Sequence, residues 1–189
     1  MMLLNGHETF GWGTIILHWM IALLILGLIV LGFIMVRPDI DPELQFSLYQ
    51  WHKSFGMTVL ALSVIRVIWW LTNRHPASVK GLSPLEARSA SAVHLLLLAM
   101  TIAVPLAGWA VASTSTLGIP TLVFNRVLVP HLPLRPSAEA EAFWTTTHAL
   151  LAYGMGGLVV LHMVAAFHHE FIRRDGVLSR MIRGSLGKR

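Results

Sequence analysis

The stretch Thr147–His162 reads THALLAYGMGGLVVLH and decides how the rest of the chain is interpreted. It carries no charged residue, which suits a helix in the hydrocarbon core of a bilayer, yet it holds His148 and His162. These histidines are 162 − 148 = 14 residues apart, which is about 21 Å along a helix at 1.5 Å per residue. They differ by about 40° around the helix axis. One face of the predicted helix therefore presents an imidazole near each of its ends.

The composition of the chain indicates that lipid is its solvent. Of its 189 residues, 55% are hydrophobic and 12% are charged, whereas about 25% of the residues are charged in a typical soluble domain. The chain has no cysteine, which excludes disulfides, thiolate-bound clusters and a covalently attached haem. We expect a single membrane domain over residues 1–189.

Four segments are long and apolar enough to cross a bilayer, which takes about 20 residues of helix. The predicted spans cover residues 15–36, 51–71, 92–112 and 148–167. The first is not expected to be a cleaved signal peptide, because no basic segment precedes it and no small-x-small cleavage site follows before Arg37. Four successive spans predict an all-α, antiparallel four-helix bundle.

The charges of the connections predict the orientation of this bundle. The first connection carries Arg37 against three acidic residues, whereas residues 72–91 carry three basic residues against Glu86, and residues 170–189 form a basic tail. The positive-inside rule then places the second connection and both termini in the cytoplasm. Since no separate polar domain is visible, we expect the tail to face the membrane surface and not nucleic acid.

The third connection, residues 113–147, is long and rich in proline. Its middle, TLVFNRVLV at residues 121–129, is amphipathic. Two interpretations stay open for this segment: it lies on the membrane surface, or it is a plain connector.

Four histidines fall at two depths of the predicted bundle. His18 and His162 lie toward the cytoplasmic side, and His52 and His148 lie toward the opposite side. Two imidazoles at each depth are what two six-coordinate haems need, and such an iron exchanges electrons because it has no open position for oxygen. His94 also lies at the cytoplasmic depth, so depth alone does not decide whether His162 or His94 partners His18.

Other uses of these histidines fit less well. A single intramembrane histidine is more often a hydrogen-bonding group between helices, but four at matched depths favour ligands. A di-iron site needs inward-facing glutamates, and all nine acidic residues lie outside the apolar centres. Catalytic zinc needs three ligands at one level, and proton-coupled transporters usually have intramembrane carboxylates. A histidine relay that carries ions stays open as an alternative.

Several motifs, taken in their order and spacing, resemble the prokaryotic cytochrome b561 family from about Thr14 onward. They are His18-Trp19, the run WHKSFG at residues 51–56, Arg66 with Trp69, His94 with Pro105, the His148/His162 spacing, and HHEFIRRDGVLSRM at residues 168–181. The resemblance implies a four-helix cytochrome of the bacterial inner membrane with two non-covalent b haems. It implies that His18 and His162 ligate one iron, and that His52 and His148 ligate the other.

The resemblance also implies electron transfer linked to the quinone pool. One expectation is an oxidoreductase that takes electrons from superoxide or another periplasmic donor and reduces ubiquinone or another quinone. A second expectation is a haem-bearing subunit that relays electrons within a larger redox complex. The expected partners are membrane lipid, quinone, an unidentified electron donor, and a redox partner subunit or a second copy of the chain.

Five further residues are candidates for secondary roles. His94 is either a hydrogen-bonding group near the cytoplasmic-side haem or an interfacial histidine. Arg66 and Lys53 either extend to the membrane surface or pair with haem propionates, and Lys53 could also attract an anionic donor. His168 and His169 either form a polar helix end or act catalytically, as proton donors to quinone on the cytoplasmic side.

Overall fold

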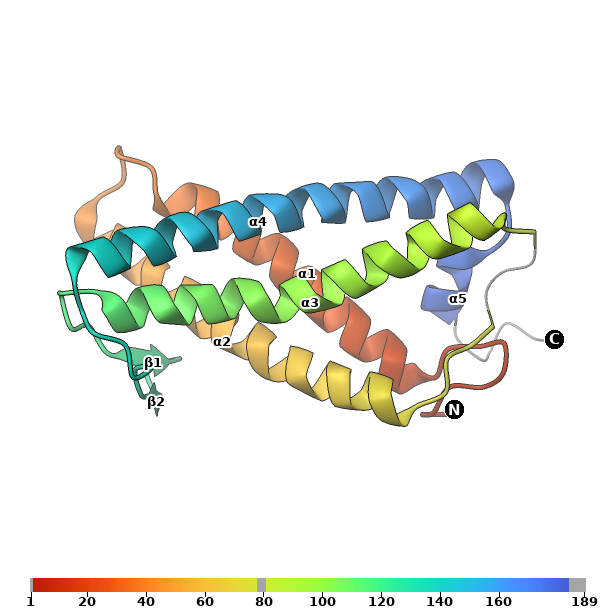
Figure 1. Cartoon of the computed structure of the whole chain (residues 1–189), viewed down its shortest axis with the longest axis horizontal. Coiled ribbons are helices and arrows are strands. Elements are labelled where there is room, and N and C mark those ends of the chain that lie inside the picture. The colour runs from red at the N-terminus through yellow and green to blue at the C-terminus, as the bar shows by residue number, and fades with distance from the viewer. Residues whose placement is uncertain (1, 78–80, 184–189) are drawn as a thin grey trace.

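The computed structural model describes residues 2–77 and 81–183, which form a bundle dominated by four long helices (Figure 1). These are α1 (Trp12–Met35), α2 (Pro42–Thr72), α3 (Pro84–Thr114) and α4 (Ala138–Phe167). A π-helical turn, η1 (His168–Arg173), continues α4, and the short helix α5 (Val177–Arg183) follows it. Lys80 and residues 184–189 of the predicted basic tail lie outside the described residues.

All four long helices are apolar enough to cross a membrane, which confirms the predicted four-helix membrane fold. Three of them begin well before the predicted apolar spans, because each has a capping residue there. Asp41 accepts hydrogen bonds from backbone N–H groups of the first turn of α2, Ser83 forms a capping box with Glu86 in α3, and Ser137 caps α4. The 31 residues of α2 extend over about 46 Å, so its ends project beyond the hydrocarbon core.

Each long helix packs against its neighbour in the sequence, α1 on α2, α2 on α3 and α3 on α4. At the centre of the bundle, Ile21 and Ile25 of α1 meet Val59 of α2 and Met155 of α4 in a buried apolar cluster. Many other large apolar side chains, such as Leu23 with 65% of its surface exposed, lie on the outside. An apolar exterior is stable against lipid, since a bilayer offers no polar partners.

The connection between α3 and α4 contains an antiparallel hairpin, β1 (Thr121–Val123) and β2 (Val127–Val129), in which Val123 pairs with Val127. The predictions for this segment, a membrane-surface stretch or a plain connector, did not anticipate these strands. β-Branched residues on both sides of the turn favour strands, and the turn itself places Phe124 and Asn125 in the left-handed region, at φ 51° and 55°.

The hairpin is held against α2. The backbone N–H of Phe124 donates to Ser54 Oγ at 3.0 Å, and the Phe124 ring packs against the rings of Trp51 and Phe55. We call this end of the bundle, at the left of Figure 1, the hairpin end.

The opposite end, at the right of Figure 1, carries α5 and the described N-terminal residues, and we call it the α5 end. There the indole N–H of Trp19 donates to the carbonyl oxygen of Met181 at 2.8 Å. The guanidinium of Arg180 donates to the carbonyl oxygens of Glu8 and Ala77. These bonds connect α5 to α1, to the N-terminal segment and to the connection between α2 and α3.

Candidate functional site

Toward the hairpin end, His52 of α2 and His148 of α4 face each other. Their ring centroids are 6.1 Å apart and the ring planes are nearly perpendicular, at 87°. His52 lies ten residues after Pro42 and His148 ten residues after Ala138, or about 15 Å along each helix. The predicted membrane spans begin near these two histidines, and the helices extend beyond the spans because both begin earlier, at their capping residues.

The orientation of His148 is set by α3. Its Nδ1–H donates to the carbonyl oxygen of Val104 at 2.9 Å, which leaves Nε2 with a free lone pair. The ring approaches α3 this closely because Gly108 has no side chain, since a Cβ there would lie 3.1 Å from the imidazole. Metal-binding histidines almost always donate their other ring N–H in this way.

In the ring of His52, Nδ1 is buried and has no hydrogen-bond partner among the described residues. The ring lies beside Gly32 of α1, where an added Cβ would come within 3.6 Å of it. A buried polar atom without a partner is rare in native proteins and calls for a specific explanation, such as a ligand or a bound ion.

Toward the α5 end, three histidines from three helices come together. The ring of His162 on α4 lies 6.3 Å from that of His18 on α1 and 5.4 Å from that of His94 on α3, measured between centroids. The structure thus brings both sequence-based candidates for the partner of His18 to the same level.

An iron bound between two imidazoles requires a particular distance between the centroids of the two rings. Bonds of about 2 Å from the metal to one nitrogen of each opposed ring hold the centroids about 6 Å apart. The separations for His52 with His148 and for His18 with His162, 6.1 and 6.3 Å, fit this value. The 5.4 Å between His94 and His162 is shorter than an intervening iron needs. The residues present therefore fit a bis-histidine iron at each level.

Arg66 of α2 contacts His18, with its Nη2 atom 3.3 Å from His18 Nδ1. A guanidinium only donates hydrogen bonds, so this contact requires Nδ1 to accept and Nε2 to carry the proton. A metal bound at Nε2 requires the opposite tautomer. Binding a metal there would release Arg66 from Nδ1, and its guanidinium would be free to pair with an anionic group such as a propionate.

The other predicted residues lie near these two levels or beyond them. The ammonium of Lys53 is 3.4 Å from the carbonyl oxygen of Pro120, just before β1, so Lys53 helps to hold the hairpin. His168 and His169 do not end an α-helix but begin the π-helical turn η1. His169 Nδ1 forms a 2.6 Å contact with a carboxylate oxygen of Asp175, and no such contact was predicted.

Gly108, beside His148, and Asp175, beside His169, were not predicted as residues of a site. The sequence contains a signal for Gly108 only. Gly108 follows Pro105 in the middle of an apolar span, and a helical glycine at such a place often allows a close approach. Asp175 carried no signal, because its contact depends on a chain reversal after η1. Among residues 2–77 and 81–183, no three His, Asp or Glu side chains group closely enough to hold a bare metal ion.

Four membrane-spanning helices that present paired imidazoles at two levels define a class of protein, the membrane cytochromes that bind b-type haem. The chain belongs to the prokaryotic cytochrome b561 family, whose model matches residues 9–184. It is similar to cytochrome b561 homolog 2 of Escherichia coli K12, with 30% identity over 94% of this chain and 93% of that protein. It is also similar to the probable superoxide oxidase CybB of Yersinia pestis, with 26% identity over 93% and 97% of the two chains.

Membership of this family establishes the general role of the protein. It is a multi-pass protein of the bacterial inner membrane, and it takes part in membrane electron transfer as a member of a family that binds b-type haem.

Proposed function

We propose that this protein holds two b-type haems and passes electrons from a donor at the hairpin end to a quinone at the α5 end. The observation that carries the proposal is the pairing of His52 with His148 and of His18 with His162 at separations suited to an intervening iron. When bound, a haem iron with two imidazole ligands takes up and gives up one electron and binds no oxygen. His94 then lies beside His162 as a neighbour of one ligand and not as a ligand itself.

The positive-inside rule supports a periplasmic hairpin end and a cytoplasmic α5 end. In and beside η1 and α5, basic residues outnumber acidic ones. The basic residues are Arg173, Arg174, Arg180 and Arg183, and the acidic residues are Glu170 and Asp175. In the connection from α1 to α2, Arg37 pairs with Asp39 at 2.7 Å. Asp41 and Glu43 follow, and no second basic residue between residues 37 and 43 balances their negative charges. Arg37 holds the pKa of Asp39 below its usual value, so this acid keeps its negative charge to lower pH than a free aspartate.

Superoxide is the donor that we propose at the hairpin end. The name of the Yersinia pestis relative supports this choice. Superoxide is a small anion, and Lys53, which follows His52 in α2, holds its ammonium at the start of the hairpin, 3.4 Å from the carbonyl oxygen of Pro120. Arg126 lies in the exposed turn of the hairpin that packs on the same helix. Cations around an entry point raise the local concentration of an anionic substrate.

A quinone is the acceptor that we propose at the α5 end. An apolar groove of about 420 Å³ runs between the lipid-facing side of α1 and α5, with Trp12, Trp19 and Leu23 on one wall and Met181 and Ile182 on the other. The ring of Trp19 lies edge-on to His18, 5.3 Å between centroids. A quinone that enters this groove from lipid would place its tail against an apolar surface. Its head group would be separated from His18 by the ring of Trp19.

Besides superoxide and quinone, the overall reaction needs only two protons, which the aqueous phase supplies. Two superoxide ions lose one electron each and become two molecules of O₂, while one quinone gains two electrons and two protons and becomes a quinol. Purified protein in liposomes with ubiquinone should therefore consume superoxide and form quinol in a ratio of two to one. Formation of quinol only after a second protein is added would contradict the proposal and favour the relay subunit.

A further inference from the structure

Trp19 follows His18 in α1, and the helix turns these two neighbours toward different surroundings, since successive residues of an α-helix point about 100° apart. The ring of His18 faces that of His162 inside the bundle, with 6.3 Å between the centroids. Trp19 lines the apolar groove between α1 and α5, and 37% of its surface is exposed. This residue pair therefore reaches both the candidate iron level and the groove.

The indole of Trp19 is also bonded to the opposite wall of the groove. Its N–H donates to the carbonyl oxygen of Met181 at 2.8 Å. Met181 lies in the last turn of α5, where carbonyl oxygens have no N–H partner inside the helix. Since Met181 and Ile182 form the wall opposite α1, this hydrogen bond joins the two walls and limits the rotation of the indole.

Arg180 attaches α5 to the rest of the α5 end. Its guanidinium donates to the carbonyl oxygens of Glu8 and Ala77, at 2.8 and 3.0 Å. It also lies over the ring of Phe10, 5.3 Å from the centroid, at a distance suited to a cation–π contact. Arg180 and Met181 close the run HHEFIRRDGVLSRM, so the end of this motif has a place in the structure as one wall of the groove.

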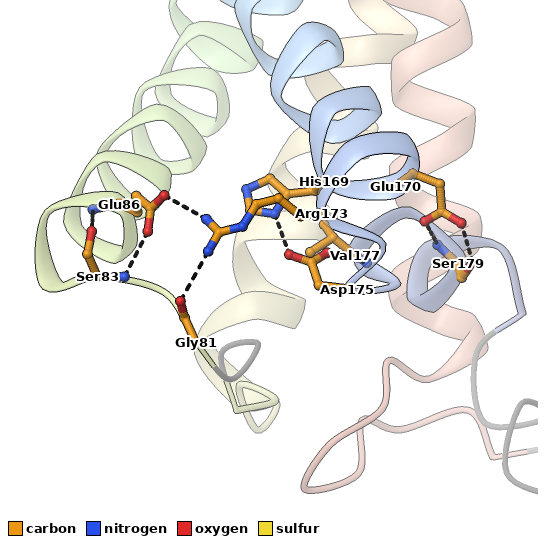
Figure 2. Close-up of polar contacts among 9 residues, drawn as sticks. All are labelled: Gly81, Ser83, Glu86, His169, Glu170, Arg173, Asp175, Val177 and Ser179. Atoms are coloured by element: carbon orange, nitrogen blue, oxygen red, sulfur yellow. Dashed lines mark hydrogen bonds and ion pairs between the residues drawn. The ribbon is translucent and has the colours of Figure 1, made fainter.

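Carboxylates fix the start of α5 to the preceding turn η1 (Figure 2). Glu170 accepts hydrogen bonds from the hydroxyl and the backbone N–H of Ser179. Asp175 Oδ1 accepts from the backbone N–H of Val177 at 3.3 Å. The wall is thus in place before a ligand enters the groove, and a site that is already ordered loses less entropy when it binds.

We propose that Trp19 is the binding residue for the quinone head group, and that its bond to Met181 keeps α5 in position as the other wall of the quinone site. This inference rests on the proposed function. A quinone ring is flat and conjugated, so it can stack on an indole with the offset that aromatic pairs prefer. Trp19 is neither oxidised nor reduced in this role, because the two electrons come from the donor and the two protons from the aqueous phase.

The chemistry of the groove favours a neutral, lipid-soluble ring as its occupant. Every residue that lines it is apolar or aromatic. An anionic or strongly hydrated acceptor would lose water there without gaining a polar partner, whereas a quinone with an apolar tail would not. A quinone packed on Trp19 has one side chain between itself and His18, since the two rings lie 5.3 Å apart between centroids.

Two variants separate the two roles of Trp19. Trp19→Phe retains an aromatic surface and loses the N–H that bonds Met181, whereas Trp19→Leu loses both. Trp70→Leu is the matched control. Trp70 lies near the end of α2 at the α5 end, has 45% of its surface exposed and contacts the ring of His75, but it does not line the groove.

The kinetic test uses the full-length haem-loaded proteins, compared at equal haem content. Each is chemically reduced and mixed in a stopped-flow instrument with increasing ubiquinone-1 or with ferricyanide. The half-saturating concentration of ubiquinone-1 should rise about fivefold in Trp19→Phe, because one hydrogen bond is lost, and about 30-fold in Trp19→Leu, because the stacking surface is lost as well. The maximal rate should stay within about twofold of the wild type, as expected for a loss of binding alone. Ferricyanide should reoxidise all four proteins equally, and Trp70→Leu should match the wild type with ubiquinone-1.

A second readout needs no turnover. An azido-ubiquinone with a short tail is photolysed with the oxidised wild-type protein, and the labelled residues are mapped by mass spectrometry. We expect labels on α1 at or beside Trp19 and on Met181 or Ile182 of α5, and we expect excess ubiquinone-1 to prevent them. Trp19→Leu should lose most of this labelling, and Trp70→Leu should retain it.

The outcomes separate this inference from the proposed function. Wild-type protein that is reoxidised by ferricyanide but not by ubiquinone-1 would show that the proposed function is wrong. An unchanged half-saturating concentration in Trp19→Leu would overturn the inference and leave electron transfer to quinone standing. Labels on wild-type protein that fall outside α1 and α5 would also overturn it, and this result decides the question even if both Trp19 variants fail to fold.

Discussion

The Nδ1–H of His148 donates to the carbonyl oxygen of Val104 at 2.9 Å, and this bond leaves Nε2 as the ring nitrogen of His148 that has a free lone pair. The ring of His52 lies 6.1 Å away between centroids, and its buried Nδ1 has no hydrogen-bond partner within residues 2–77 and 81–183. One histidine is thus oriented by the backbone and the other has an unused nitrogen, an arrangement that a metal between them would complete.

If these two histidines ligate one iron, removing either should have the same consequence as removing both. We expect His52→Ala, His148→Ala and the double variant each to bind one haem per chain where the wild type binds two. The double variant His18→Ala/His52→Ala, which affects both levels, should bind none. Pyridine haemochrome analysis of the purified proteins measures these ratios. A haem lost from His52→Ala but retained in His148→Ala would show that the pairing is wrong.

His94 provides the control at the α5 level, because its ring is close to His162 but too close to share an iron with it. We expect His94→Ala to retain two haems, whereas His162→Ala retains one. The absorption maximum of one haem should shift slightly in His94→Ala, since a neighbour of its ligand is removed. Loss of a haem from His94→Ala with retention in His18→Ala would mean that the partner of His162 is His94.

Gly108 tests the packing that orients His148. A Cβ at this position would lie 3.1 Å from the imidazole, and a valine side chain would push the ring away from Val104. We expect Gly108→Val to lose the hairpin-level haem and to cost about 1–3 kcal/mol of unfolding free energy through overpacking. Gly27→Val on α1 is the control, because a Cβ at Gly27 meets no atom within 4 Å. Haem content and thermal unfolding in detergent measure both effects, and equal haem content in the two variants would count against this account of Gly108.

Arg66 tests the electrostatics of the α5 level. Its guanidinium lies 3.3 Å from His18, and a positive charge near an iron favours the reduced state. We expect Arg66→Gln to retain both haems and to lower one midpoint potential by about 60 mV, which is a tenfold change for a one-electron couple. Lys53→Gln, at the other level, should leave that potential unchanged. A redox titration followed by absorbance checks this, and an unchanged pair of potentials in Arg66→Gln would contradict the expectation.

The sequence predicts the four spans well because a bilayer demands long apolar helices, but it predicts their starts poorly. Hydropathy reports only the part of a helix inside hydrocarbon, so the predicted spans begin near His52 and His148, whereas the helices begin ten residues before each of them. The capping signals were present in the sequence, in Asp41-Pro42 and in Ser83 with Glu86, and they account for the earlier starts.

Other features depend on contacts that a periodic pattern does not report. The depth of the histidines follows from their spacing, but the choice between His162 and His94 as the partner of His18 depends on lateral distances across the bundle. The bond between His169 and Asp175 depends on a left-handed Arg174, a residue type with no particular preference for that conformation. The hairpin was readable in principle from its β-branched residues, though its amphipathic pattern also suited a surface segment.

The most direct test of the account is the number and spin state of the haems in the wild-type protein. Pyridine haemochrome analysis against protein mass, together with electron paramagnetic resonance of the oxidised protein, measures both. We expect two b haems per chain, each low-spin with two imidazole ligands. One haem or none per chain, or a high-spin iron with an open position, would contradict it.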